Sequence, residues 1–381
     1  MTLRPLLPAL LPTLLVFLAA CASAPVTDRE PDEGAEHEPL LADAGIAHVV
    51  VPEAFVTAST PADNIDSPAS WLAPDGGRWL LATAKATDLL IVYDGASGAR
   101  LRTVGGPGAG PGQLQRPNGI AVVEDPGAGA GHALALVVER DNHRVQAFAL
   151  PALESVAIFG SEDLVQPYGL WVRPLDGAFE VIVSDNYMSS QDEDLPPPDV
   201  ELDRRFKRYR LRRDGGAWSA DLLGSFGETG EGAIRIAESV FGDISNDRLL
   251  LAEEDVASGT RLREYGLDGR YRGRDIGAGL FKAQAEGLAL WRCGNDGYWI
   301  ATDQFKDRSL FHIFDRDTLA HVGAFAGERT ANTDGIWLDQ APDARFPEGV
   351  FYAVDDDQAV AAFDWRDVAK ALGLQETCKT P

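Results

Sequence analysis

The chain alternates short apolar runs with polar, glycine-rich turns, and few segments show the periodicity of a helix. A small residue followed by an apolar strand start recurs six times. These small residues are Ala69, Gly119, Gly169, Ser239, Gly287 and Gly335. They lie 48 to 50 residues apart, except for one separation of 70. A repeat of this length is typical of the blades of a β-propeller.

A second apolar run follows the first in every unit. These runs are Trp79–Thr83, Ala133–Val138, Phe179–Val183, Arg248–Ala252, Tyr298–Ala301 and Val350–Val354. A third alternating run, such as residues 144–150, follows in most units, and several units add a fourth, such as residues 99–105. Six units of about four short strands predict an all-β fold, a six-bladed β-propeller.

Three further segments complete this prediction. The strand predicted at Ala47–Val56 has no unit of its own, and we expect it to pair with the last blade and close the ring, because closure removes an exposed sheet edge. Residues 191–203 account for the long separation and are predicted as a surface loop. The segment Trp365–Leu374 is predicted as a short helix.

Residues 1–20 are predicted as a targeting segment, in which Arg4 precedes the apolar run Leu6–Ala20. At about 15 residues this run is too short to span a bilayer comfortably. Its end, Leu18-Ala19-Ala20-Cys21, resembles a bacterial lipobox, which implies an exported lipoprotein acylated at Cys21. Because Ala22 rather than Asp follows the cysteine, we expect the outer membrane. A plain cleaved signal peptide and an uncleaved anchor are the alternatives.

The remaining chain divides into a flexible acidic tether over residues 21–45 and the propeller domain over residues 46–381. The formal net charge of −25 argues against a nucleic-acid partner and is compatible with a cation binder. We expect a monomer. Export would permit a disulfide between Cys293 and Cys378, and two free thiols are the alternative.

Carboxylates gather where two strand ends should meet. Neighbouring strands of a blade run antiparallel, so the start of the first strand and the end of the second lie on one face, around the channel mouth. The residues before the six small residues are Pro68, Asn118, Tyr168, Glu238, Glu286 and Asp334. The second strands end at Lys85, at 139–141, at 185–186, at 253–255, at 303–304 and at 355–357.

The last three units place most of the acids at this mouth, without His or Cys. Clustered carboxylates repel one another unless cations lie among them, and all-oxygen ligands favour Ca²⁺. The alternative is that these acids are ordinary turn residues, since Asp is common in turns. Glutamate is a poor turn former, so Glu238, Glu253, Glu254 and Glu286 favour a cation site.

The same stretches resemble the β-propeller phytases. The matching segments are Leu251-Ala252-Glu253-Glu254-Asp255, Ala285-Glu286-Gly287-Leu288, Gly297-Tyr298-Trp299-Ile300-Ala301, Thr333-Asp334-Gly335-Ile336 and Phe346-Pro347-Glu348-Gly349-Val350-Phe351. The early Asp66-Ser67-Pro68-Ala69 is similar to the family's opening motif. The resemblance covers roughly residues 60–370. It implies hydrolysis of phytate or a related phosphomonoester that depends on several calcium ions, with a calcium-bridged water as nucleophile.

The resemblance also implies roles for individual residues. The implied calcium ligands are Asp66, Glu238, Glu253, Glu286, Gln304, Asp334 and Asp355. Of these, Glu238, Glu286 and Asp334 are implied to surround the nucleophile, and Lys85, Arg140 and Tyr168 are implied to contact substrate. The chain departs from the family at Gln284, where an Asp is usual, and at Ser184-Asp185-Asn186-Tyr187, which lacks a lysine.

A second resemblance favours a different function. Residues 105–123 and 141–150 are similar to an NHL repeat, a unit of propellers that often act as binding modules. The alternative function is therefore a non-catalytic, calcium-stabilised surface propeller that binds a protein or a glycan. A propeller hydrolase with a single calcium at the channel mouth, such as a lactonase, is a third possibility. The basic run 204–213 is predicted as a solvated strand rather than an anion-binding patch.

Overall fold

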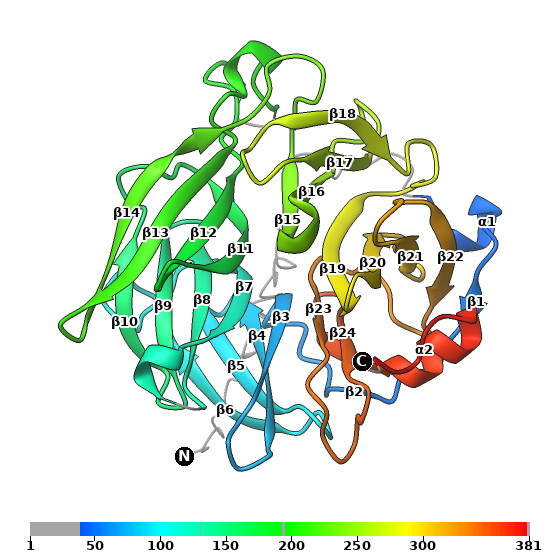
Figure 1. Ribbon diagram of the computed structural model, residues 1–381, viewed down its shortest axis with the longest axis horizontal. Helices are drawn as coiled ribbons and strands as arrows, with labels where there is room; N and C mark the ends of the chain where they lie inside the picture. Colours follow the sequence, from blue (N-terminus) through cyan, green and yellow to red (C-terminus); the bar gives the residue numbers. More distant parts are fainter. Residues whose placement is uncertain (1–38, 130, 193–194, 379–381) are drawn as a thin grey trace, which may run out of the picture.

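The structure is a computed structural model that describes residues 39–129, 131–192 and 195–378. Within these residues, six sheets stand around a central axis like the blades of a propeller (Figure 1). Each blade runs outward from an inner strand, and all neighbouring strands pair antiparallel except the outermost pair of blade 5. The predicted six-bladed all-β propeller is confirmed.

The first three blades are each formed by four consecutive strands. Blade 1 contains β3 (Ile65–Leu72), β4 (Arg78–Ala84), β5 (Leu89–Asp94) and β6 (Arg100–Gly105). Blade 2 contains β7 (Pro117–Glu124), β8 (Ala133–Glu139), β9 (Arg144–Leu150) and β10 (Glu154–Phe159). Blade 3 contains β11 (Pro167–Leu175), β12 (Ala178–Asp185), β13 (Phe206–Asp214) and β14 (Ala217–Phe226).

Blade 4 is again formed by four consecutive strands, whereas blades 5 and 6 each gain a strand from the start of the chain. Blade 4 contains β15 (Ala237–Asp243), β16 (Arg248–Glu253), β17 (Arg261–Tyr265) and β18 (Tyr271–Ile276). Blade 5 contains β19 (Ala285–Cys293), β20 (Asp296–Asp303), β21 (Leu310–Asp315), β22 (His321–Ala326) and β1 (Val49–Val50). Blade 6 contains β23 (Ile336–Asp339), β24 (Val350–Asp355), β25 (Ala359–Asp364) and β2 (Phe55–Val56).

The ring is closed by the early segment, as predicted, but this segment is shared between two blades. Strand β2 pairs antiparallel with β25 and completes blade 6. Strand β1 instead pairs parallel with β22 and extends blade 5. The expectation that all of residues 47–56 would pair with the last blade is therefore wrong for its first half. Both outer edges are covered by this arrangement, which blunts edge-to-edge association.

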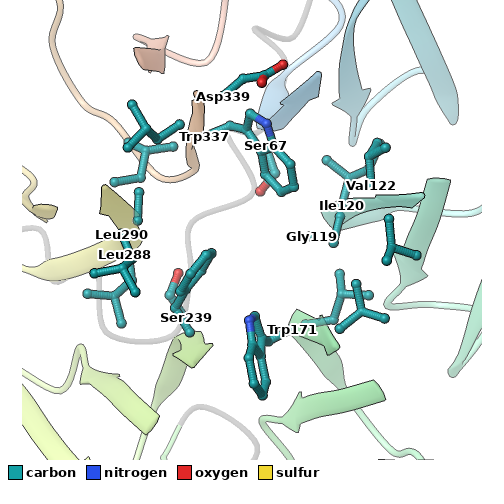
Figure 2. Close-up of a pocket in the computed structure, with 18 of the residues that line it drawn as sticks. Ser67, Gly119, Ile120, Val122, Trp171, Ser239, Leu288, Leu290, Trp337 and Asp339 are labelled. Atoms are coloured by element: carbon teal, nitrogen blue, oxygen red, sulfur yellow. The ribbon is translucent and has the colours of Figure 1, made fainter. Parts of the chain in front are cut away.

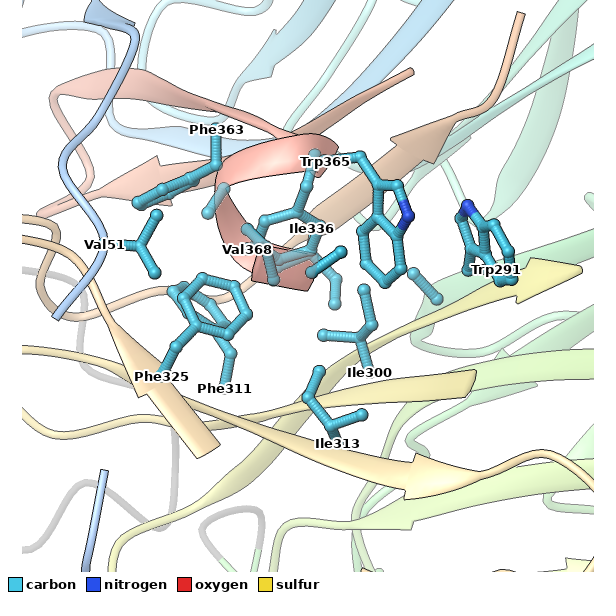
Figure 3. Close-up of a cluster of buried hydrophobic side chains, with 14 of the residues drawn as sticks. Val51, Trp291, Ile300, Phe311, Ile313, Phe325, Ile336, Phe363, Trp365 and Val368 are labelled. Carbon is cyan, nitrogen blue, oxygen red and sulfur yellow. The ribbon is translucent and has the colours of Figure 1, made fainter. Parts of the chain in front are cut away.

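The C-terminal segment packs against the same two blades. Helix α2 (Trp365–Leu372) begins where the Asp364 carboxylate accepts the backbone N–H of Arg366, and it ends at Gly373 in the left-handed conformation. Trp365 and Val368 are buried in an aromatic-rich cluster shown in Figure 3. A disulfide joins Cys293 of β19 to Cys378, so the bridge permitted by the sequence is present.

The small residues at the inner strands explain the repeat. Five of the six inner strands, all except β23, have an irregular register near their start, and neighbouring inner strands approach one another closely at this point. A Cβ atom on Gly169 would lie 2.4 Å from the carbonyl oxygen of Glu238, and one on Gly335 would lie 2.6 Å from the Cα atom of Ser67. Only a very small side chain is tolerated here.

This geometry corrects the predicted repeat in the first unit. Gly335 of the last blade faces Ser67, so Ser67 rather than Ala69 is the equivalent small residue of blade 1. The sequence was ambiguous because Ser67, Ala69 and Ser70 are all small. The correction places Asp66, not Pro68, at the rim position that precedes the small residue.

The predicted tether and loop are only partly described. Helix α1 (Leu41–Ala44) lies within the predicted tether, and Leu41 is buried against blade 5, so the end of this segment belongs with the propeller. The predicted targeting segment and Cys21 lie outside the described residues. The described part of the 191–203 loop is exposed at Leu195 and Val200, as expected. Neither helix of the described chain could span a membrane.

Candidate functional site

One side chain at or just before the start of each inner strand lies at the mouth of the central channel. These residues are Asp66, Asn118, Tyr168, Glu238, Glu286 and Asp334. We call this set the inner ring. All but Asp334 are buried, and Asp334 is only slightly exposed. Their polar groups meet across blade boundaries, since the Asn118 amide donates to Asp66 Oδ1 at 3.3 Å.

A second set follows the end of each second strand. These residues are Lys85, Arg140, Asn186, Glu254, Gln304 and Asp356. We call this set the outer ring. The backbone holds it in place, because Glu254 N donates to Ile236 O at 3.1 Å and Gln304 N donates to Gln284 O at 2.9 Å. Each outer-ring residue is thereby held beside the start of its own inner strand.

The residue just before each outer-ring position has a different role. In five blades it is an acid: Glu139, Asp185, Glu253, Asp303 and Asp355. Each carboxylate accepts one or two backbone N–H groups from the loop that enters the inner strand. These five acids therefore clamp the loops that carry the inner ring.

Two of the predicted calcium ligands are such clamps. Glu253 is fully buried and accepts N–H groups from Arg235 at 2.8 Å and Ile236 at 3.0 Å. Burial raises the pKa of Glu253 to about 7, although these two hydrogen bonds oppose the shift. Asp355 accepts the N–H of Ala331 at 3.1 Å, and burial likewise raises its pKa.

The structure gathers three glutamates instead. Carboxylate oxygens of Glu238, Glu254 and Glu286 all lie within 4.8 Å of one another, and all three residues are buried. The Gln284 amide donates to Glu254 Oε1 at 3.1 Å. Buried carboxylates this close repel one another, and hard oxygen donors suit Ca²⁺, so these residues fit the implied ion. Glu254, which the sequence placed among the acids of the mouth but the family resemblance did not imply as a ligand, joins Glu238 and Glu286.

A second acidic pair lies at the boundary of blades 6 and 1. The Lys85 ammonium lies 3.2 Å from Asp66 Oδ1 and 3.4 Å from Asp334 Oδ2. The Gln304 amide donates to Asp334 Oδ1. Burial raises the pKa of Asp334 well above its ordinary value, and the positive charge of Lys85 only partly opposes this. Three predicted ligands, Asp66, Gln304 and Asp334, are thus brought together around a lysine.

The predicted substrate residues come from blades 1 to 3 and are separated from the glutamate cluster by the channel axis or lie at its side. Lys85 and Arg140 belong to the outer ring of blades 1 and 2, whereas the glutamate cluster belongs to blades 4 and 5 across the axis. Tyr168 is buried in the inner ring of blade 3. Arg140 is half-buried, and its neighbour His143 is exposed.

The basic run 204–213 was predicted as a solvated strand, and this is wrong in part, because Arg205 and Lys207 are buried and form local interactions. Lys207 of β13 lies 3.0 Å from Asp185, and Arg208 lies 3.6 Å from Glu180. Arg205 is completely buried, and its guanidinium donates to three backbone carbonyls. These contacts stabilise blade 3.

Below the mouth, apolar side chains form much of the channel wall. A cavity of about 660 Å³ is lined by the inner strands, with aliphatic and aromatic side chains that include Ile120, Trp171, Leu288 and Leu290 (Figure 2). The inner ring therefore stands above an apolar wall. Electrostatic interactions weaken less beside such a wall than in bulk water.

Comparisons with known proteins assign the chain to no family, and the structural similarity they find is distant. No protein-family model matches the chain, and no curated protein matches it. A chain of hydrazine synthase from Kuenenia stuttgartiensis is 12% identical, with a TM-score of 0.43, over 84% of this chain and 82% of that one. BBS1N, solved in complex with ARL6DN, is 10% identical, with a TM-score of 0.44, over 83% and 97%. The chain belongs to the class of six-bladed β-propellers by its own sheet arrangement.

Proposed function

We propose that this propeller is a Ca²⁺-dependent phosphomonoester hydrolase of the phytase type that acts at the channel mouth. The observation that carries the proposal is the buried cluster of Glu238, Glu254 and Glu286. Three of the motifs that resemble the phytases, at residues 251–255, 285–288 and 297–301, lie in the same blades, which supports the same chemistry. Phytate or a related phosphomonoester is the proposed substrate class.

In this proposal some residues of the mouth bind the calcium ion and others bind the substrate. The three glutamates would hold the ion, and Asp334, which accepts a hydrogen bond from Gln304, follows Glu286 in the inner ring. Bound calcium would screen the charge of the phosphate and activate a water. Arg140, across the axis, donates hydrogen bonds to phosphate oxygens, since guanidinium groups suit this geometry. Tyr168 lies between these two sides and positions the substrate.

Removing calcium tests the proposal. The full chain should release phosphate from phytate or from glycerol phosphate in the presence of Ca²⁺. A chelator should abolish this release, and excess Ca²⁺ should restore it, because three buried carboxylates cannot position a phosphate dianion without a cation. Release would be measured as inorganic phosphate over time. Release that is unaffected by the chelator, or no release from either substrate, would contradict the proposal.

The non-catalytic alternative has one observation in its favour. Lys85, a proposed phosphate-binding cation, is engaged by Asp66 and Asp334, which leaves fewer positive charges to bind a phosphate. A calcium-stabilised binding module predicts a melting temperature that rises with Ca²⁺ and no turnover of any phosphoester. Thermal unfolding with and without chelator, run beside the phosphate assay, separates the two functions.

A further inference from the structure

The Lys85 ammonium lies between two carboxylates, where a bound metal ion would otherwise be expected. The ammonium approaches one carboxylate from each of two blades, Asp66 at 3.2 Å and Asp334 at 3.4 Å. The exposed fractions of the three side chains are 7%, 1% and 13%. A lysine so deeply buried keeps its charge only where acids compensate for the lost hydration. The two aspartates provide this compensation.

The remaining oxygens of this acidic pair are also occupied by protein donors. Ser67 Oγ donates to Asp66 Oδ2 at 2.7 Å, and Asn118 donates to Asp66 Oδ1. The Gln304 amide donates to the Asp334 oxygen that Lys85 does not contact. A calcium ion needs about six to eight oxygen ligands. Here the Asn118 and Gln304 amides direct N–H groups, rather than carbonyl oxygens, toward the two acids.

We propose that the Lys85 ammonium is a built-in cation that takes the place of a metal ion between Asp66 and Asp334. The mouth then binds calcium at the three-glutamate cluster and not at this acidic pair. The inference deepens the proposed function, because it concerns the same mouth and sets how many ions that mouth holds. It also makes Lys85 a counter-ion of the protein rather than a ligand of the phosphate.

The test is the number of calcium ions bound by the full chain, measured by isothermal titration calorimetry. Lys85→Met removes the ammonium and keeps the length of the side chain. This variant should bind one calcium ion more than the wild type, because two uncompensated carboxylates then face one another. Adding Asp334→Asn to Lys85→Met should return the number to that of the wild type.

Two matched controls support this comparison. Lys85→Arg keeps a cation at the position and should leave the number unchanged. Lys370→Met removes a lysine from the exposed face of α2 and should also leave it unchanged. A folded Lys85→Met variant that binds no additional ion would overturn the inference.

If Lys85→Met does not fold, a second variant still tests the role of Lys85. Asp334→Asn in the wild-type background should then leave the number of bound ions unchanged, and a lost ion would contradict the inference. The test also differs from that of the proposed function. If the wild type releases no phosphate, the proposed function fails, yet the difference in bound calcium between wild type and Lys85→Met still decides the role of Lys85.

Discussion

Replacing Glu254 by glutamine is expected to weaken calcium binding by at least about 100-fold and to abolish calcium-dependent phosphate release at low calcium. Glu254 is one of three buried glutamates whose oxygens lie within 4.8 Å. An amide keeps the shape of the side chain but removes one of the three negative charges. Replacement of residues that only orient metal ligands already costs about 10–100-fold in affinity, so loss of a ligand should cost at least as much. Calorimetry and the phosphate assay would measure both effects.

The neighbouring variant Glu253→Gln should behave differently. Glu253 accepts two backbone N–H groups of the loop before β15, and an amide in its place can accept with only one oxygen. We expect a loss of about 1–3 kcal/mol in the free energy of unfolding, with calcium affinity changed only slightly. Glu124→Gln, at the opposite end of the channel, is a matched control and should affect neither property. Equal loss of affinity in the Glu253 and Glu254 variants would contradict the assignment of these two roles.

The different roles of Glu253 and Glu254 could not be predicted from the sequence. Successive side chains of a strand point to opposite sides, so one of two adjacent glutamates must face away from the mouth. The sequence places both at the end of a strand, yet it does not show which one meets the loop. That choice depends on the irregular register of β15 against β16, a property of the folded blade.

The fold itself was predictable because its signal repeats. Six strand starts, with four of the five separations at 48 to 50 residues, define six blades, and an unpaired early strand implies closure of the ring. The register of the first blade was not predictable, because several small residues surround Ser67. Likewise, the position of Lys85 between two aspartates depends on the contact between the first and last blades, which are far apart in sequence.

The inner strands connect the fold to the site, and Gly169→Val should show this connection. A Cβ atom at Gly169 would lie 2.4 Å from the carbonyl oxygen of Glu238, a rigid backbone group of the next blade. Overpacking of this kind costs typically 1–3 kcal/mol, and we expect about 3 kcal/mol here because backbone must move. The displaced strand carries Glu238, so calcium affinity should fall as well.

The matched control for this variant is Gly230→Val. Gly230 is exposed, and no atom lies within 4 Å of the position its Cβ would take. Denaturant unfolding in the presence of a chelator would give the change in stability, and calorimetry on the folded variant would give the change in affinity. A Gly169→Val protein that is destabilised but binds calcium with wild-type affinity would show that the glutamate cluster tolerates movement of the inner strand. Loss of both properties would instead show that the close approach of neighbouring blades sets the geometry of the mouth.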